Sequence, residues 1–146
     1  MHVWRILALI VGVSLMTLAG CGATPPEPEL PPGTLSSTPP PLGDAEQGRE
    51  LFVNTLALTG SPNCISCHVV EAGEVAIVGP ALVGIASLAS QRDPNLTAEE
   101  YLYRSIVVPN EYIVTGYNAG IMPRTYGLYL SREQIGHLLA YMLTLE

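Results

Sequence analysis

Three segments in the C-terminal two thirds of the chain carry apolar residues at helical spacing. The last of them has an i, i+3, i+4, i+7 stripe, which predicts a helix with one buried face. The three stripes consist of Leu51, Phe52 and Leu56, of Leu102, Ile106 and Val107, and of Ile135, Leu138, Leu139 and Met142. No stretch alternates apolar and polar residues as a half-buried strand would. The pattern therefore predicts an all-α domain.

Polar residues at the start of each stripe support the same helices, because their side chains can accept hydrogen bonds from free backbone N–H groups. The capping pairs are Asp44 with Gln47, Thr97 with Glu100, and Ser131 with Gln134. We expect the first helix to fade before Gly60, Pro109 to stop the second, and the third to reach the C-terminus. The segments between them, which contain Gly84 and Gly127, are expected to be loops.

Residues 1–20 are predicted to be a targeting segment. Arg5 precedes an apolar stretch of about 14 residues, which suits a signal peptide better than a membrane-spanning helix. The end of this stretch, Leu18-Ala19-Gly20-Cys21, resembles the lipobox of bacterial lipoproteins. The resemblance implies that Cys21 becomes the lipidated first residue of the mature protein. The alternative is an uncleaved anchor in which Cys21 has no special role.

Residues 21–43 are predicted to be a tether. From Gly22 to Gly43 the chain holds eight of its 13 prolines and no aromatic residue. Such a segment cannot recover its ordering entropy by packing, so we expect it to be disordered. Extended at about 3.1 Å per residue, it would reach roughly 70 Å. It either lets the folded domain, residues 44–146, sweep the membrane surface, or it is a passive spacer.

Charge and composition narrow the classes of function. Thirteen acidic residues against six basic ones give a net charge of −7, and no lysine is present. This balance argues against nucleic acid as a partner, because phosphates require a basic surface. The folded part is short and poor in aromatic residues, so its hydrophobic core is marginal by itself. We therefore expect a cofactor to fill it.

Cys64-Ile65-Ser66-Cys67-His68 identifies that cofactor, because C-x-x-C-H is the attachment sequence of c-type haem. Two thiols three positions apart can each bond the porphyrin edge, and the next imidazole then faces the iron. A zinc site would need two further ligands, and His137 is the one other histidine beyond the targeting segment. A thioredoxin-type redox pair lacks its βαβ setting, and a Cys64–Cys67 disulfide would leave the core underfilled.

The chain from residue 44 onward resembles the class I monohaem cytochromes c. Gly48 and Phe52 match the family's first helix, and Leu138 and Tyr141 match the helix that crosses it. The remaining matches are Cys64, Cys67 and His68, then Gly79-Pro80-Ala81-Leu82, then Met122-Pro123. The resemblance implies a small cytochrome c fold, with three main helices around one covalently bound haem c. It also implies that the Pro80 carbonyl accepts a hydrogen bond from His68.

Met122 is the expected sixth ligand of the iron. Met1 and Met16 lie in the targeting segment and Met142 lies on a core stripe, whereas Met122 lies in a loop and is followed by Pro123. The alternatives are a gap-filling role for Met122, or His137 as the ligand. We expect His137 to face solvent, because it is off the apolar stripe of its helix.

Several residues near Met122 are weaker candidates for the cofactor site. Tyr117 and Arg124 could bind haem propionates or pack on the ring, although ordinary packing explains them as well. The acidic residues are interpreted as a solvated surface, or else as a docking face for a basic partner. The family's lysine-rich carriers dock onto acidic partners, and this lysine-free chain departs from that pattern.

Together these features predict a lipid-anchored cytochrome that transfers single electrons on the extracytoplasmic (periplasmic) face of a bacterial membrane, in a respiratory or photosynthetic chain. Its expected partners are redox proteins or subunits of a membrane complex, with no small-molecule substrate. We favour a fixed subunit of a quinol-oxidising complex, such as one resembling alternative complex III. The alternatives are a mobile tethered carrier and, with less support, a haem enzyme such as a peroxidase.

Overall fold

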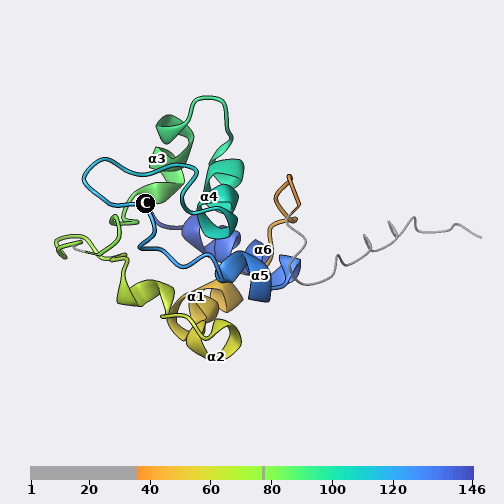
Figure 1. Cartoon of the computed structure of the whole chain (residues 1–146). Helices are drawn as coiled ribbons and strands as arrows, with labels where there is room; N and C mark the ends of the chain where they lie inside the picture. The colour runs from red at the N-terminus through yellow and green to blue at the C-terminus, as the bar shows by residue number, and fades with distance from the viewer. Residues whose placement is uncertain (1–35, 77) are drawn as a thin grey trace, which may run out of the picture.

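The computed structural model describes residues 36–76 and 78–146, and every regular element within these ranges is helical (Figure 1). The three longest helices correspond to the three predicted segments. They are α1 (Ala45–Asn54), α4 (Ala98–Val107) and α6 (Arg132–Met142). The other elements are α2 (Leu56–Thr59), the 3₁₀ turn η1 (Cys64–Ser66), α3 (Ile85–Arg92) and α5 (Tyr126–Tyr129). The all-α prediction is confirmed. The predicted targeting segment, Cys21 and tether residues 22–35 lie outside the described residues.

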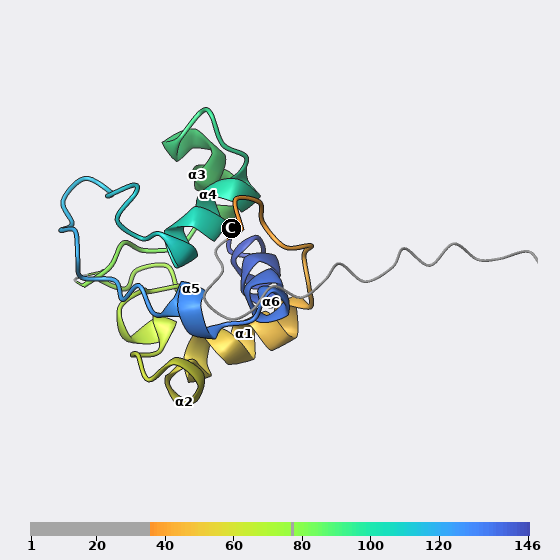
Figure 2. The same cartoon turned by 45° about the vertical axis from the view of Figure 1, so that its right-hand side comes forward.

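Helices α1 and α6 cross at close range and form the most extensive helix contact of the described domain (Figure 2). A Cβ atom on Gly48 would overlap the backbone carbonyl of His137, so only glycine permits this approach. Beside it the rings of Phe52 and Tyr141 meet edge to face, with centroids 5.4 Å apart. The residues matched to the family's helix crossing therefore do lie at a helix crossing.

Two of the predicted capping boxes are present with both of their hydrogen bonds. In α4 the Thr97 hydroxyl accepts from the Glu100 N–H at 3.2 Å, and the Glu100 carboxylate accepts from the Thr97 N–H at 2.8 Å. Ser131 and Gln134 make the equivalent pair at the start of α6, at 3.1 and 2.9 Å. Each box satisfies two backbone donors that the helix itself leaves free.

The start of α1 differs from its prediction. The Asp44 carboxylate accepts from the Gln47 N–H at 2.8 Å, as a cap should. The second bond of a capping box, from the Asp44 N–H to the Gln47 side chain, is not formed. The Asp44 N–H instead donates to Nδ1 of His137 at 2.7 Å. The expectation that His137 faces solvent is therefore wrong: its side chain is buried at the α1–α6 junction. Although His137 is off the apolar stripe of its helix, Gly43 and Asp44 from the start of α1 cover its ring.

Two short helices were not predicted, and the first predicted helix is interrupted. It ends at Asn54, and α2 begins after the buried Thr55. Helix α3 follows Gly84, which has φ 72° and provides no side-chain cap, and it buries only Ile85 and Ala89. Helix α5 is one turn long and contains Gly127. Short helices without caps give little periodic signal, because a single turn holds one or two buried positions.

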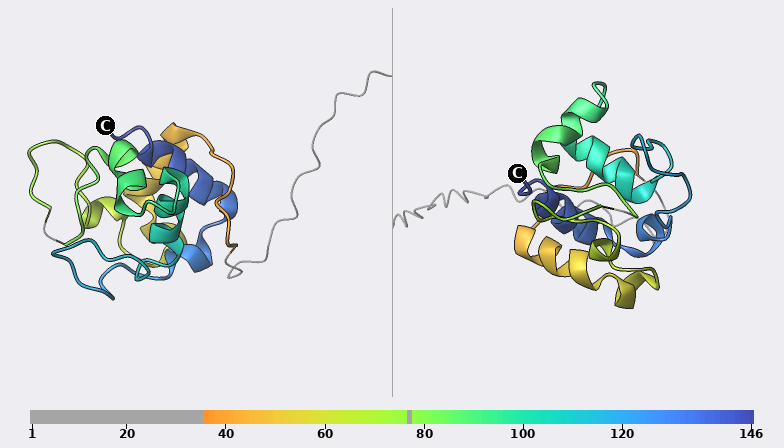
Figure 3. Two further views of the ribbon diagram at one scale, coloured as in Figure 1. Left: turned by 90° about the horizontal axis from the view of Figure 1, so that it is seen from above. Right: turned by 90° about the vertical axis from the view of Figure 1, so that its left-hand side faces the viewer.

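Helix α6 lies between α1 with α2 on one side and α3 with α4 on the other (Figure 3). Two long loop segments, 68–84 (described except at residue 77) and 108–125, extend from the same side of the molecule (Figure 1). The last eight residues of the predicted tether, 36–43, are also described, and they lie against the helices instead of projecting from them. No helix in the described part of the chain is long and apolar enough to span a membrane.

Candidate functional site

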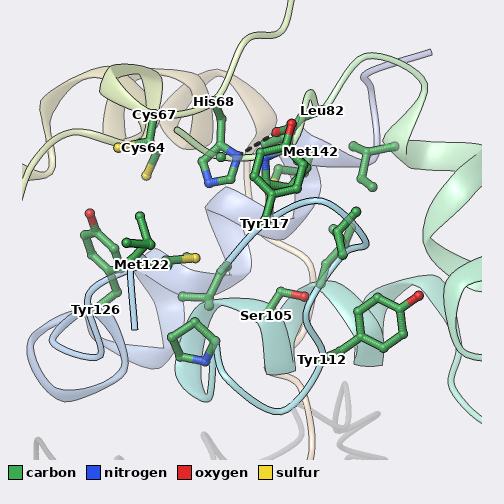
Figure 4. A pocket seen from close by; sticks show the side chains of 18 of the residues that line it. Cys64, Cys67, His68, Leu82, Ser105, Tyr112, Tyr117, Met122, Tyr126 and Met142 are labelled. Carbon is green, nitrogen blue, oxygen red and sulfur yellow. Dashed lines mark hydrogen bonds between the residues drawn. The ribbon is translucent and has the colours of Figure 1, made fainter. Parts of the chain in front are cut away.

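A cavity of about 140 Å³ lies between the helices and the two loop segments (Figure 4). One buried water requires roughly 10–15 Å³ by this measure, so the space suits an organic group. Its apolar walls come from α1, α3, α4 and α6. Among the lining residues are Phe52, Leu82, Ile85, Leu102, Ile106, Leu138 and Met142. Protein interiors are close-packed and contain few voids larger than a water molecule, so a cavity of this size indicates a bound group.

Cys64, Cys67 and His68 stand together at one edge of this cavity (Figure 4). The turn η1 arranges them, because the N–H groups of Cys67 and His68 both donate to the Cys64 carbonyl, at 3.1 and 3.0 Å. No disulfide joins the two cysteines. Burial raises the pKa of the Cys64 thiol to about 11. Because they are not joined to each other, both thiols lie free at the cavity wall, three positions apart and next to an imidazole.

The imidazole of His68 is held in one orientation. Its Nδ1 lies 2.8 Å from the Pro80 carbonyl, which can only accept, so Nδ1 donates and Nε2 keeps its lone pair. A Cβ on Gly79 would lie 2.7 Å from Cε1 of this ring, so the chain passes directly over it. Burial, with a smaller contribution from Arg92, lowers the pKa of His68. A neutral imidazole with a free Nε2 is the form that binds iron.

Met122 and Met142 both line the cavity (Figure 4). Met142 comes from the core face of α6, as its stripe predicts, whereas Met122 comes from the loop between α4 and α5. That loop is tied by a hydrogen bond of 2.7 Å from the Gly120 N–H to the Asn110 side chain. His137, the alternative ligand, lies at the α1–α6 junction and does not line the cavity. The described geometry thus brings Met122, and not His137, to the same space as His68.

The cavity wall contains one cation and no acidic residue among its described members. The cation is Arg92, whose guanidinium donates to the Tyr101 hydroxyl at 3.1 Å. Sequence reasoning missed Arg92, because it ends a helix that the pattern did not predict. Tyr117 lines the cavity, whereas Arg124 is exposed and does not line it. A haem carries two propionate groups, and an acid-free wall with one guanidinium suits them.

These features fit a covalently bound haem. The cavity supplies two unpaired thiols, an oriented imidazole, a thioether and one cation within mostly apolar walls. In the described ranges, no three His, Cys, Asp or Glu side chains are grouped so that they could hold a metal ion. A zinc site built on Cys64 and Cys67 therefore finds no additional ligands there.

Tyr126 closes the cavity beside the cysteines, and its titration gives a test of the local packing. Its hydroxyl donates to the Pro62 carbonyl at 2.6 Å, and burial raises the pKa of Tyr126 to about 12. Unfolding therefore releases this proton between pH 10 and 12, so the stability it contributes below pH 10 is lost as the pH rises. We expect the free energy of unfolding to fall more steeply over this interval in the wild type than in Tyr126→Phe. Denaturant titrations at each pH measure the two slopes, and equal slopes would contradict this environment.

Comparison with known proteins agrees with the site. The family model for cytochrome c matches residues 45–146, which is more than two thirds of the chain. The matched region starts at the first residue of α1 and includes every residue of the cavity wall. No curated protein was found to match the chain.

Proposed function

Because the chain belongs to the cytochrome c family and is therefore an electron-transfer haem protein, we propose that it holds one haem through Cys64 and Cys67, with His68 and Met122 as axial ligands. The observation that carries this assignment is that these four side chains line one cavity. The hydrogen bond from His68 Nδ1 to the Pro80 carbonyl supports it, because it leaves Nε2 free for iron.

When bound, the haem supplies a one-electron ferric–ferrous couple. The chain's residues determine how that couple is used. His68 stays neutral and oriented through the Pro80 carbonyl, and the apolar walls around Phe52 and Leu138 exclude water. His68 and Met122 would both hold the iron of this haem, and with two protein ligands the site would leave no place for oxygen or peroxide. This arrangement suits an electron carrier and not a haem enzyme.

We further propose that a lipid on Cys21 attaches the protein to the extracytoplasmic face of a bacterial membrane. The support is the short apolar segment that ends in Leu18-Ala19-Gly20-Cys21. In this setting the protein serves a respiratory or photosynthetic chain. Its partners are then redox proteins or other subunits of a membrane electron-transfer complex.

The anchor is tested by replacing Cys21 with serine, which removes the sulfur that carries the lipid. We expect the variant, with its haem still attached, to move from the membrane fraction to the soluble fraction. Haem staining of the separated fractions measures this distribution. Thr17→Ser, a conservative change in the same segment, should leave the protein in the membrane. If Cys21→Ser remains as firmly bound as the wild type, Cys21 is not the anchor.

Complex membership is tested in native membranes extracted with mild detergent and resolved by size. We expect the covalent haem of this chain to migrate with a large assembly, with other subunits in a fixed ratio, as a subunit of a quinol-oxidising complex would. Haem that migrates with the isolated chain would instead make the protein a mobile carrier between such a complex and an oxidase or reaction centre.

A further inference from the structure

Residues 36–43, which we call the strap, lie against α4 and α6 although their composition predicts disorder. The hydroxyl of Tyr103 in α4 donates to the Ser36 carbonyl at 2.8 Å. Arg132, at the start of α6, donates to the carbonyls of Thr38 and Pro39 at 3.3 and 3.4 Å. These contacts hold the backbone of the strap through its carbonyl groups, which prolines retain.

The other end of the strap is packed more tightly. The Gly43 N–H donates to the Gly136 carbonyl at 3.0 Å. A Cβ on Gly136 would overlap the Pro41 carbonyl, and a Cβ on Gly43 would overlap the His137 ring. Pro40 is buried. The strap is thus held to the helix surface by contacts at both of its ends, and two glycines permit its close approach.

The strap lies on the side of the domain away from the cavity loops. In α4, Tyr101, Leu102 and Ser105 line the cavity, whereas Tyr103 points to the strap from the other face of the helix. Arg132, Gly136 and His137 do not line the cavity either. In Figures 1 and 2 and in the left view of Figure 3, the strap (orange) and the described parts of the cavity-lining loops, 68–76, 78–84 and 108–125, lie on opposite sides of the molecule. The described chain therefore begins, at Ser36, on the side opposite the cavity loops.

We propose that the strap is an orienting device: it fixes the attachment point of the tether on the far side of the domain, so that a membrane anchor favours orientations in which the cavity loops face outward, toward a partner that rises above the membrane. This inference rests on the proposed anchor at Cys21. It also shortens the free tether to the 15 residues 21–35. At about 3.1 Å per residue these reach roughly 45 Å, instead of the roughly 70 Å that the sequence alone suggests.

The docking of the strap is tested with a nitroxide label at Ser37→Cys on the full, haem-containing chain in detergent. Because the Ser37 side chain is exposed, docking restricts the label only through the ordered backbone, and we expect a wild-type spectrum of restricted motion. Tyr103→Phe combined with Gly136→Ala removes the first contact and overlaps the Pro41 carbonyl, so the label should become mobile. Tyr129→Phe, on an exposed ring, should leave the wild-type spectrum unchanged. A label as mobile in the wild type as in the double variant would overturn the proposal.

The orientation is tested in lipid vesicles that contain a nickel-chelating lipid as a relaxation agent. A label at Ser37 should be relaxed several-fold more strongly than one at Val75→Cys, in the exposed part of a cavity loop. The double variant should reduce this ratio toward one. Equal relaxation of the two labels in the wild type, or stronger relaxation at Val75, would overturn the proposal. A chain that does not bind vesicles would instead contradict the anchor, and the detergent spectra would still decide whether the strap is docked.

Discussion

Replacing Met122 with alanine is expected to leave the haem attached through Cys64 and Cys67 but to lower the reduction potential by on the order of a few hundred millivolts. A thioether ligand stabilises ferrous iron, and its loss leaves the sixth position to water or another weak donor. The thioether-to-iron charge-transfer absorption should disappear at the same time. Potentiometric titration and the visible spectrum of the purified variant measure both effects.

Met142→Leu is the matched control, because Met142 is the other methionine of the cavity wall. Leucine has a similar volume, so the core around α6 should tolerate it. We expect its potential and charge-transfer absorption to stay close to those of the wild type. If Met142→Leu abolishes the absorption and Met122→Ala keeps it, the assignment of the two methionines is reversed.

Gly48→Ala is expected to cost about 3 kcal/mol of stability, or to prevent folding around the haem. The new Cβ would overlap the His137 carbonyl and come within 2.8 Å of the Tyr141 Cβ. Neither atom can move away cheaply, because one belongs to the backbone of α6 and the other is fixed beside it. The helices must therefore separate, which also disturbs the Phe52–Tyr141 contact. Chemical denaturation followed by haem absorbance measures the loss.

Gly60→Ala separates this contact effect from the general cost of replacing a glycine. Gly60 has φ 67°, and a Cβ added there would meet no other atom within 4 Å, so only backbone strain opposes alanine. That strain is about 1 kcal/mol. A loss at Gly48 no larger than the loss at Gly60 would contradict the close crossing of α1 and α6.

Features that depend on neighbouring residues were predictable from the sequence. The capping boxes of α4 and α6 join residues three apart, and C-x-x-C-H places its three side chains within one turn. The partnership of His68 with Pro80 spans 12 residues, and it was accessible only through the resemblance to a known family. A motif within one helical turn can be inferred from the residues alone, whereas the contact of the Pro80 loop with the His68 ring cannot.

The features that were missed depend on contacts between distant parts of the chain. His137 is buried because Asp44 donates to it across 93 positions. Arg92 reaches the cavity because an uncapped helix places it there, and the strap is ordered because α4 and α6 offer it a surface. Composition alone describes residues 36–43 as a disordered tether. The backbone carbonyls of these residues nevertheless accept hydrogen bonds from Tyr103 and Arg132 of the folded domain.

Covalent attachment of one haem at Cys64 and Cys67 is best tested by peptide mass spectrometry. The chain has no lysine, so trypsin cleavage after Arg49 and Arg92 releases residues 50–92, which contain both cysteines. After acid–acetone extraction, which removes noncovalent haem, this peptide should carry the mass of one haem and no free thiol. An unmodified peptide with two free thiols, and haem in the extract, would contradict the account.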